Sequence, residues 1–202
     1  MSKVLYNLAL KRWFDVIAAS LLLAVLAPLL ALIALVMRIQ SPGPVMYRQT
    51  RIGKHGEHFT IYKFRTMIPD RRGQRKPFDG EERRKRHKTA RDPRVTAAGQ
   101  FLRRTSIDEL PQLVNILRGD MSFIGPRPEL PEIVMRYEDW QHQRHLVTPG
   151  LSGWWQVEGR SDLPMHENTG LDIYYVAHQS AMLDLKIVLR TFRALVSRGG
   201  AF

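Results

Sequence analysis

Residues 16–37, VIAASLLLAVLAPLLALIALVM, form an apolar run without a charged side chain, and Ser20 is its only hydroxyl. A helix over these 22 residues would be about 33 Å long at 1.5 Å per residue, enough to cross the hydrocarbon core of a bilayer. A soluble helix would keep a polar face for water, which this run lacks. The run is too long for a secretory signal peptide, and no small-residue cleavage site precedes Arg38. We therefore predict a membrane helix that the protein retains.

The charges on either side of this run constrain its path through the bilayer. Pro28 lies near the middle of the run, where it removes a backbone hydrogen bond and kinks a helix. The positive-inside rule places basic flanks in the cytoplasm, which a single span with two basic flanks cannot satisfy. We therefore predict a re-entrant helix–kink–helix in preference to a simple span. The flanking residues are Lys3, Lys11 and Arg12 before the run, and Arg38, Arg48, Arg51 and Lys54 after it.

Beyond the membrane run, the sequence predicts a mostly helical α+β unit with short strands. The segment Ser41-Pro42-Gly43-Pro44 would stop the helix, because neither proline can continue it. Apolar and polar residues alternate from Val45 to Met67 around a Gly53–Gly56 turn, a pattern typical of a strand pair. The domains would be a membrane part, 1–40, and a membrane-associated cytoplasmic part, 41–202. We expect helices at 96–104, 107–117, 131–145, 171–178 and 182–198, and a short strand or loop at 151–157.

Two of the expected helices carry further information. Ser106 is a candidate N-cap for the helix at 107–117, and Pro111 would fall in its first turn, where a missing amide donor is tolerated. The helix at 182–198 has an apolar stripe opposite three basic residues. Such an amphipathic, basic helix is typical of a membrane interface, and packing onto the domain's own core explains the stripe equally well.

The net charge of +12 is concentrated in one segment. Thirteen basic residues face four acidic ones between Arg71 and Arg104. Such a block could bind nucleic acid, anionic lipid headgroups or phosphorylated substrates, and a solvated basic loop explains it equally well. No motif assigns a role to residues 71–91. The chain contains no cysteine, which excludes disulfides and fits a reducing compartment, and its seven histidines show no metal-ligand spacing.

An acidic pair, Asp108 and Glu109, lies in the segment TSIDELPQLVNILRGDMSFIGPRPE, residues 105–129. Basic residues stand on both sides of it, and the rigid turn Gly125-Pro126-Arg127-Pro128 follows. Adjacent carboxylates repel one another, so both stay ionised only where cations or a metal share the space. The pattern suggests a site for a divalent metal and phosphate, and on charge alone a surface salt-bridge cluster fits as well. Carboxylate and phosphate oxygens suit magnesium, and no cysteine–histidine cluster argues for zinc.

Five blocks of sequence together resemble one protein family, the bacterial sugar transferases, which are small monotopic phosphoglycosyl transferases. The blocks are LKRWFDVIAASLLLAVLAPLLALIALVMRIQSPGPVMYRQTRIG, IYKFRTM, DPRVTAAGQFLRRTSIDELPQLVNILRGDMSFIGPRPE, RHLVTPGLSGWWQVEGR and LDIYYV, in this order from Leu10 to about Leu189. The resemblance implies transfer of a sugar-1-phosphate from a UDP-sugar to polyprenyl (undecaprenyl) phosphate, with release of UMP. It implies a re-entrant helix and a catalytic domain at the cytoplasmic face of the bacterial inner membrane. The reaction would be the first membrane step of bacterial glycoconjugate assembly.

The resemblance also implies roles for individual residues. Asp108 would be the nucleophile that forms a covalent aspartyl-phosphosugar, and Glu109 together with Asp108 would hold magnesium. A carboxylate that attacks the β-phosphorus makes an acyl phosphate, which splits one transfer into two displacements. Magnesium and arginines would neutralise the diphosphate and the charge on the leaving phosphate. The substrate-binding candidates are Lys63, Arg103, Arg127, Arg160 and Asp172, the last of which could instead cap the helix at 171–178.

One position departs from the family pattern. Ala27 stands before Pro28 where the family commonly has serine, whose hydroxyl could satisfy a carbonyl freed by the proline. The implied partners are a UDP-sugar, polyprenyl phosphate and the bilayer, and no nucleic acid. The transferred sugar, the glycan pathway and the oligomeric state, a homodimer included, stay open. The competing interpretation is a membrane-anchored protein whose basic block binds nucleic acid or anionic lipid, and such a protein would release no UMP.

Overall fold

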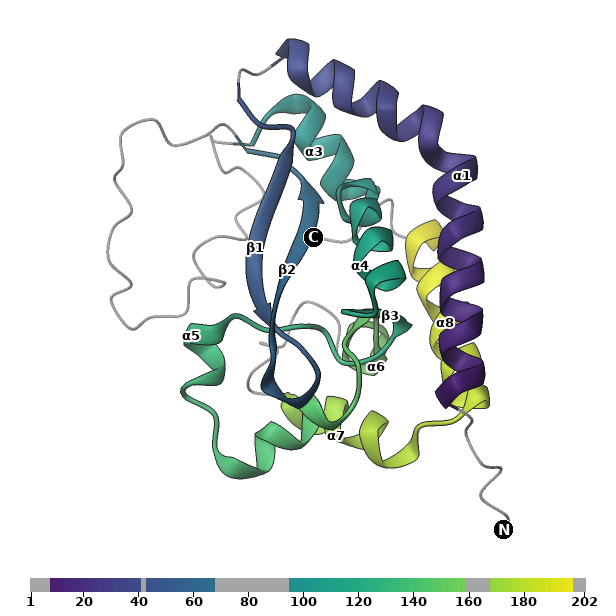
Figure 1. Cartoon of the computed structure of the whole chain (residues 1–202), viewed down its shortest axis with the longest axis vertical. Helices are drawn as coiled ribbons and strands as arrows, with labels where there is room; N and C mark the ends of the chain where they lie inside the picture. The colour runs from purple at the N-terminus through teal and green to yellow at the C-terminus, as the bar shows by residue number, and fades with distance from the viewer. Residues whose placement is uncertain (1–7, 41–42, 68–94, 159–167, 198–202) are drawn as a thin grey trace.

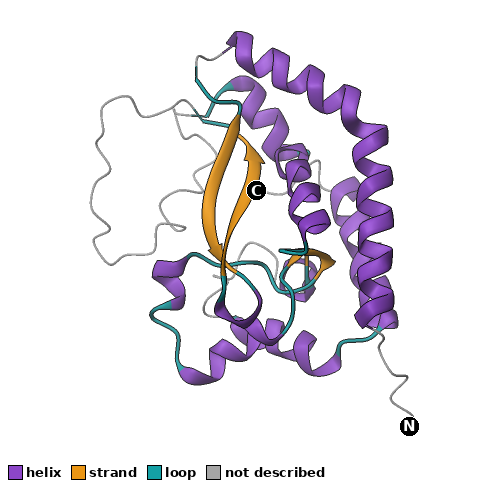
Figure 2. Cartoon of the chain, viewed as in Figure 1, coloured by secondary structure: helices purple, strands orange, loops and turns teal. Residues whose placement is uncertain are grey.

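The computed structural model describes residues 8–40, 43–67, 95–158 and 168–197. In these residues a long N-terminal helix lies along one side of short helices and two small sheets (Figures 1 and 2). This mixture confirms the predicted combination of helices and short strands behind a long apolar helix. The α-helices are α1 (Leu8–Gln40), α3 (Ala97–Arg104), α4 (Leu113–Arg118), α5 (Pro131–Val134), α6 (Trp154–Glu158), α7 (Thr169–His178) and α8 (Ala181–Ser197). The other elements are 3₁₀ helices η1 (Lys54–Gly56), η2 (Ile107–Gln112) and η3 (Asp139–Leu146) and strands β1 (Met46–Ile52), β2 (His58–Phe64), β3 (Ser122–Ile124) and β4 (Gly150–Ser152).

Helix α1 carries the apolar run and bends along its length (Figure 1), with Pro28 inside it. It is long and apolar enough to cross a membrane, and 6% of its most apolar window is buried against the rest of the protein. Ala19, in the first half, packs into a core cluster with residues of α4, and Met37, in the second half, packs against Phe64 and Leu102. Both halves of α1 therefore contact the domain. Its re-entrant path through a bilayer stays a prediction.

The first turns of α1 are tied to the domain by polar side chains. Lys11 Nζ donates a hydrogen bond to the Asp184 carboxylate of α8 at 2.5 Å. The Arg12 guanidinium donates to two carbonyls in the last turn of α4, where backbone acceptors lack partners within the helix. The buried Asp15 carboxylate accepts from a backbone N–H of β3. Lys11 and Arg12, two of the basic residues that flank the apolar run, thus bind the domain itself.

Strands β1 and β2 form an antiparallel hairpin in which Met46 lies opposite Phe64. The turn between them is η1, where Gly56 adopts a φ of 80° that favours glycine. This confirms the strand pair predicted over residues 45–67. The hairpin packs against η2 through β2, so it supports the segment that carries the acid pair.

The segment predicted as one helix over 107–117 consists of η2 followed by α4. Pro111 lies inside η2 and has no N–H to donate within it, so this turn lacks one backbone hydrogen bond. Ser106 stands at the N-cap position of η2 as predicted, in a left-handed conformation with a φ of 57°, but its side chain makes no capping hydrogen bond. Thr96 does cap a helix, because its hydroxyl accepts a hydrogen bond from the Gly99 amide at 2.9 Å. Helix α3 begins at the next residue, which confirms the helix predicted over 96–104.

Two other segments differ from their predicted form. Residues 131–145 divide into α5 and η3, because Glu138 starts a new helix through a capping box. Residues 151–157 divide between β4 and the helix α6, where a strand or loop was expected throughout. The chain turns at Gly153, which lies so close to Gly125 that a Cβ there would come within 2.2 Å of the Gly125 carbonyl oxygen. A glycine is therefore needed where the strand ends and α6 begins.

Helices α7 and α8 confirm the two predicted C-terminal helices. One sector of α8 packs inward and another faces out, so packing onto the domain's core is confirmed for part of the apolar stripe, whereas a place in the membrane interface stays a prediction. Ile187 is fully buried and packs with Trp154 and Tyr175. Helix α8 lies beside the N-terminal part of α1, to which Asp184 is bonded through Lys11 (Figure 1). The exposed sector of α8 is apolar. It consists of Met182, Leu185, Leu189 and Phe192.

Candidate functional site

The acid pair lies in the first turn of η2, over the β1–β2 hairpin. The Glu109 amide donates to the Ser106 carbonyl at 3.1 Å, which closes the turn. The left-handed conformation of Ser106 lets the chain reverse sharply after α3 and present both acids from one short turn. Non-glycine residues with positive φ are uncommon and gather at functional sites, so this conformation supports a site at the pair.

Glu109 is held by two cations from different elements. Its Oε1 accepts from Lys63 Nζ of β2 at 2.5 Å and from Arg127 Nη2, in the turn after β3, at 2.8 Å. Burial by itself would raise the pKa of Glu109, but the charges of Arg127 and Lys63 outweigh it and hold this pKa well below its usual range. Glu109 is therefore ionised at any physiological pH, and it fixes both cations beside Asp108.

Asp108 has a different environment from its neighbour. Burial and the adjacent Glu109 raise the pKa of Asp108 to about 6, against the opposing charges of Lys63, Arg103 and Arg127. Its carboxylate is thus mostly ionised at pH 7 and close to three cations. Within the described ranges, the ion pairs of this turn end on Glu109 rather than on Asp108. Asp108 is the carboxylate of the pair that is left to meet a ligand.

Two more arginines border the pair. Arg103, in the last turn of α3, donates from Nε to the Thr66 hydroxyl at 2.8 Å, which fixes its side chain near Asp108. Arg51, at the end of β1, pairs with the buried Glu129 at 3.5 Å. Burial, and then the charge of Arg127, lower the pKa of Arg51 to about 10. The sequence indicated Arg51 only as a flanking charge of the membrane run, whereas the structure places it at the site.

The structure also brings Asp172 and Arg144 together beneath the turn that carries Arg127. Their side chains are 1% exposed, and Arg144 Nη2 donates to Asp172 Oδ2 at 2.5 Å. Asp172 lies in the first turn of α7 and faces this arginine rather than an open surface. Sequence reasoning missed Arg144, although it lies in one of the five blocks. Arg160 and the basic segment 71–91 lie outside the described residues.

The oxygen ligands around the acid pair decide whether the expected magnesium could bind there. No group of three or more His, Cys, Asp or Glu side chains gathers within the described residues. Magnesium in enzymes often binds through one or two carboxylates together with substrate phosphates, and Asp108 with the second oxygen of Glu109 fits that need. If bound there, the metal would be held by these two residues and would supply neutralising charge to a phosphate.

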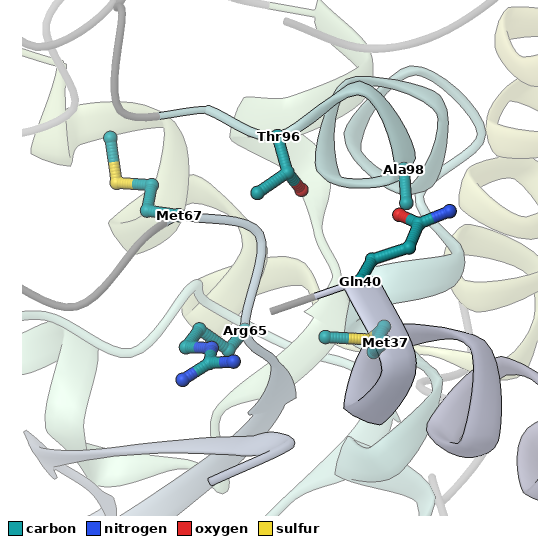
Figure 3. Close-up of a pocket in the computed structure, with 6 residues that line it drawn as sticks. All are labelled: Met37, Gln40, Arg65, Met67, Thr96 and Ala98. Atoms are coloured by element: carbon teal, nitrogen blue, oxygen red, sulfur yellow. The ribbon is translucent and has the colours of Figure 1, made fainter. Parts of the chain in front are cut away.

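A shallow, open hollow lies at the junction of the C-terminal end of α1 and the rest of the domain. Neither acid of the pair lines it, although Arg65 stands two residues beyond Lys63. The hollow is therefore distinct from the acid pair. Figure 3 shows its lining: Met37 and Gln40 from α1, Arg65 and Met67 from the chain after β2, and Thr96 and Ala98 from the start of α3.

Comparisons with known proteins identify the family of the chain. An uncharacterized sugar transferase of Bacillus subtilis, EpsL, is 41% identical over 94% of this chain and 89% of its own length. The undecaprenyl-phosphate galactose phosphotransferase of Salmonella typhimurium is 38% identical over 96% of this chain and 42% of its own length. The UDP-glucose:undecaprenyl-phosphate glucose-1-phosphate transferase of Escherichia coli is 39% identical over 95% of the chain and 41% of its own length. The chain thus spans less than half of these last two relatives. The family model for bacterial sugar transferases matches residues 6–198, so this chain belongs to that family and is a transferase.

Proposed function

We propose that the protein transfers a sugar-1-phosphate from a UDP-sugar to polyprenyl phosphate, with undecaprenyl phosphate as the acceptor, and releases UMP. The observation that carries this proposal is Asp108, an available carboxylate beside Glu109, which gathers Lys63 and Arg127. The names of the Salmonella and E. coli relatives support the acceptor. They name galactose and glucose at nearly equal identity, so the transferred sugar stays open.

The first half of the reaction forms a covalent intermediate. A carboxylate oxygen of Asp108 attacks the β-phosphorus of the donor, and a new oxygen–phosphorus bond forms. The bond from that phosphorus to the bridging oxygen breaks, and UMP leaves with the electron pair. Asp108 then carries the sugar phosphate as an acyl phosphate.

The second half restores the enzyme. A phosphate oxygen of the polyprenyl phosphate attacks the same phosphorus, and the bond to Asp108 breaks with its electrons returning to the carboxylate. The product is a polyprenyl diphosphate sugar. Two displacements let the water-soluble UMP leave before the lipid acceptor enters the same site.

The cations of the site act on the diphosphate. Lys63 and Arg127 are fixed by Glu109, and Arg103 by Thr66, so their charges need little reorganisation when the donor binds. Preorganised positive charge stabilises the negative charge that grows on the departing UMP. These residues therefore bind and orient the donor, while Asp108 supplies the attacking atom.

The contacts of α1 support a re-entrant path at the cytoplasmic face of the bacterial inner membrane. Lys11, Arg12 and Asp15 bond to the domain at one end of the helix, and Met37 packs on the domain near the other. A simple span would carry the first turns of α1 across the bilayer and break these contacts. The exposed apolar sector of α8 would lie in the same interface.

The covalent step is tested by a single turnover without lipid acceptor. Donor alone should release UMP up to about one equivalent per enzyme, because the carboxylate is consumed. Mass spectrometry should find a phosphosugar on the peptide that contains Asp108. The variant Asp108→Asn should abolish both signals, whereas the exposed control Asp139→Asn should keep them. Substantial turnover by Asp108→Asn would instead indicate direct attack by the lipid phosphate, with the acid pair serving only as a metal site.

The re-entrant path is tested by labelling, and the absence of cysteine from the chain gives a clean background. Single cysteines at Ser2 and at Gln40 should both resist a membrane-impermeant thiol reagent in intact cells, because both ends of α1 face the cytoplasm. Both should react after the membrane is permeabilised. Labelling of either one in intact cells would overturn the hairpin in favour of a span.

A further inference from the structure

Arg144 is a fully buried cation, and one of its hydrogen bonds goes to the turn that carries Arg127. Its Nη2 donates to Asp172 Oδ2 at 2.5 Å and to the Arg127 carbonyl at 2.6 Å. Its Nη1 donates to the Tyr137 hydroxyl at 2.5 Å, and the guanidinium lies 5.8 Å from that ring's centroid. The three partners come from separate parts of the chain, so Arg144 links η3, α7 and the turn after β3.

A buried ion pair is a poor source of stability, which leaves the reason for this one open. Removing two charges from water is costly, and well-packed apolar residues of similar volume are often as stable or more so. Such a pair does fix geometry, because each of its hydrogen bonds has a direction and neither charge can leave its partner. The geometry that Arg144 fixes is that of the Arg127 peptide.

The rest of that turn is already rigid. Pro126 and Pro128 have fixed φ angles and no N–H. The Gly125 amide donates to β4, and the Gly150 amide donates back to the Pro126 carbonyl, both at 2.9 Å. At Arg127 the carbonyl is held by Arg144 instead. The backbone from which the Arg127 side chain leaves is therefore set by a side chain from a distant element.

Arg127 is then held at two points, at its backbone and at its guanidinium. Its carbonyl is bound by Arg144, and its Nη2 donates to Glu109 Oε1 at 2.8 Å. A free arginine loses up to about 2 kcal/mol of rotamer entropy when it is fixed. Holding both ends in advance removes part of that loss from the step in which the donor binds.

We infer that Arg144, held by Asp172, is a positioning residue for the transfer, because it fixes the Arg127 carbonyl and thereby directs the Arg127 guanidinium toward Glu109 and the donor diphosphate. The inference rests on the proposed function, in which Arg127 meets the diphosphate. Asp172 acts through Arg144 and touches no substrate.

A double-mutant cycle on the single-turnover release of UMP separates positioning from stability. Arg144→Lys keeps a charge opposite Asp172, but one ammonium cannot reproduce the planar fork that reaches three partners at once. In the parent enzyme it should lower the first-step rate constant by about 10-fold to 100-fold, the worth of one charged hydrogen bond. In an Arg127→Ala background, the same change should cost about twofold or less, because the group being positioned is gone.

The amplitude of the release supplies the second readout. It counts folded, active enzyme, so a merely structural role of Arg144 would lower the amplitude and leave the rate constant unchanged. Ile187→Val, a core change in α8, is the matched control, and it should lower the melting temperature without changing the rate constant. If Arg144→Lys does not fold, Asp172→Asn replaces it in the double-mutant cycle. The asparagine side chain still offers an oxygen that accepts from Arg144, but it has no negative charge.

The outcomes distinguish this inference from the proposed function. Equal losses in the two backgrounds, or a loss of amplitude alone, would overturn the positioning role in an enzyme that otherwise works. A wild-type protein that releases no UMP from UDP-sugars would overturn the proposed function, and the positioning role with it.

Discussion

Arg127 belongs to two clusters of charged residues whose surroundings are opposite. Its side chain lies in an open cluster with Glu109 and Lys63, where the three side chains are 32%, 20% and 17% exposed. Its carbonyl lies in a sealed cluster with Arg144 and Asp172, whose side chains are each 1% exposed. The residue types are nearly the same in both clusters, so the contrast is one of solvent access and charge balance.

On the proposed function, the contrast separates a cluster that binds a ligand from a cluster that positions a residue. In the open cluster, Asp108 lies beside cations that an anionic ligand can still approach. In the sealed cluster, each charge has its partner, and a ligand cannot reach it. Burial also strengthens the sealed contacts, because solvent and salt weaken exposed pairs far more than buried ones. A ligand site needs charge that stays accessible, whereas a positioning contact needs charge that is already satisfied.

The largest expected effect comes from breaking the sealed cluster. Asp172→Leu leaves the Arg144 charge buried without its carboxylate, which should cost about 3–5 kcal/mol of folding stability. Glu109→Gln in the open cluster should cost less than Asp172→Leu, because Lys63 and Arg127 keep 17% and 32% exposure to water. Thermal unfolding in one detergent compares the two variants.

The double variant Arg144→Met/Asp172→Leu sharpens this test. It removes both buried charges, so it should recover more than half of the stability that Asp172→Leu loses. It should stay slow in the first transfer step, because the Arg127 carbonyl remains unbound. Equal losses for Glu109→Gln and Asp172→Leu would mean that the two clusters do not differ in kind.

The two clusters also differ in how far the sequence reveals them. The resemblance predicted Lys63, Arg103 and Arg127 as substrate-binding residues, and the structure brings the charges of all three close to Asp108. These residues belong to short blocks with recognisable spacing. Arg144 also lies in one of these blocks, but its contact with Asp172, 28 residues further along the chain, cannot be read from the block. A charged residue in a polar segment is expected at the surface, and only the tertiary fold shows that this one is buried.

Local backbone conformation also differs in how far the sequence predicts it. The long apolar helix and the strand hairpin follow from hydrophobic length and alternation, which are periodic signals. The left-handed turn at Ser106 does not, because serine there lacks the signature that glycine or asparagine would give. The flanking charges Lys11 and Arg12 were expected to report topology through the positive-inside rule. Their bonds to Asp184 and to α4 are long-range contacts that no local pattern contains.

A smaller effect should follow from titrating the acid pair with EDTA present. The pKa of Asp108, raised to about 6 by burial and Glu109, exceeds the value of about 3.9 for the unfolded chain. The folded state therefore binds this proton more tightly. Asp108 contributes stability that is complete below about pH 4 and lost as pH rises through about 6. Solvent screening of this partly exposed group reduces the loss to about 1–2 kcal/mol.

Asp108→Asn should remove that loss. The variant should be more stable than the wild type at pH 8 and equally stable at pH 4. Glu109→Gln should be less stable than the wild type at pH 8. Arg127 and Lys63 hold the pKa of Glu109 low despite its burial, so they favour the ionised form that the variant lacks. Melting temperatures of the wild type and both variants between pH 4 and pH 8 measure the two stability changes. A wild type that is stabilised relative to Asp108→Asn at pH 8 would show that Asp108 is not strained by its surroundings.

The smallest effect should come from salt. Raising sodium chloride from about 0.05 M to 0.5 M shortens the screening length from roughly 14 Å to 4 Å, which weakens the attraction of the open cluster for a diphosphate. The KM for the UDP-sugar should rise about threefold to fivefold, and Arg127→Ala should show a shallower rise, because one of the screened charges is already missing. The stability difference between the wild type and Asp172→Leu should meanwhile change by less than about 0.5 kcal/mol, since screening ions cannot enter the sealed cluster. A stability difference that shrinks in step with the rise in KM would mean that solvent reaches Arg144, and the two clusters would then be parts of one exposed surface.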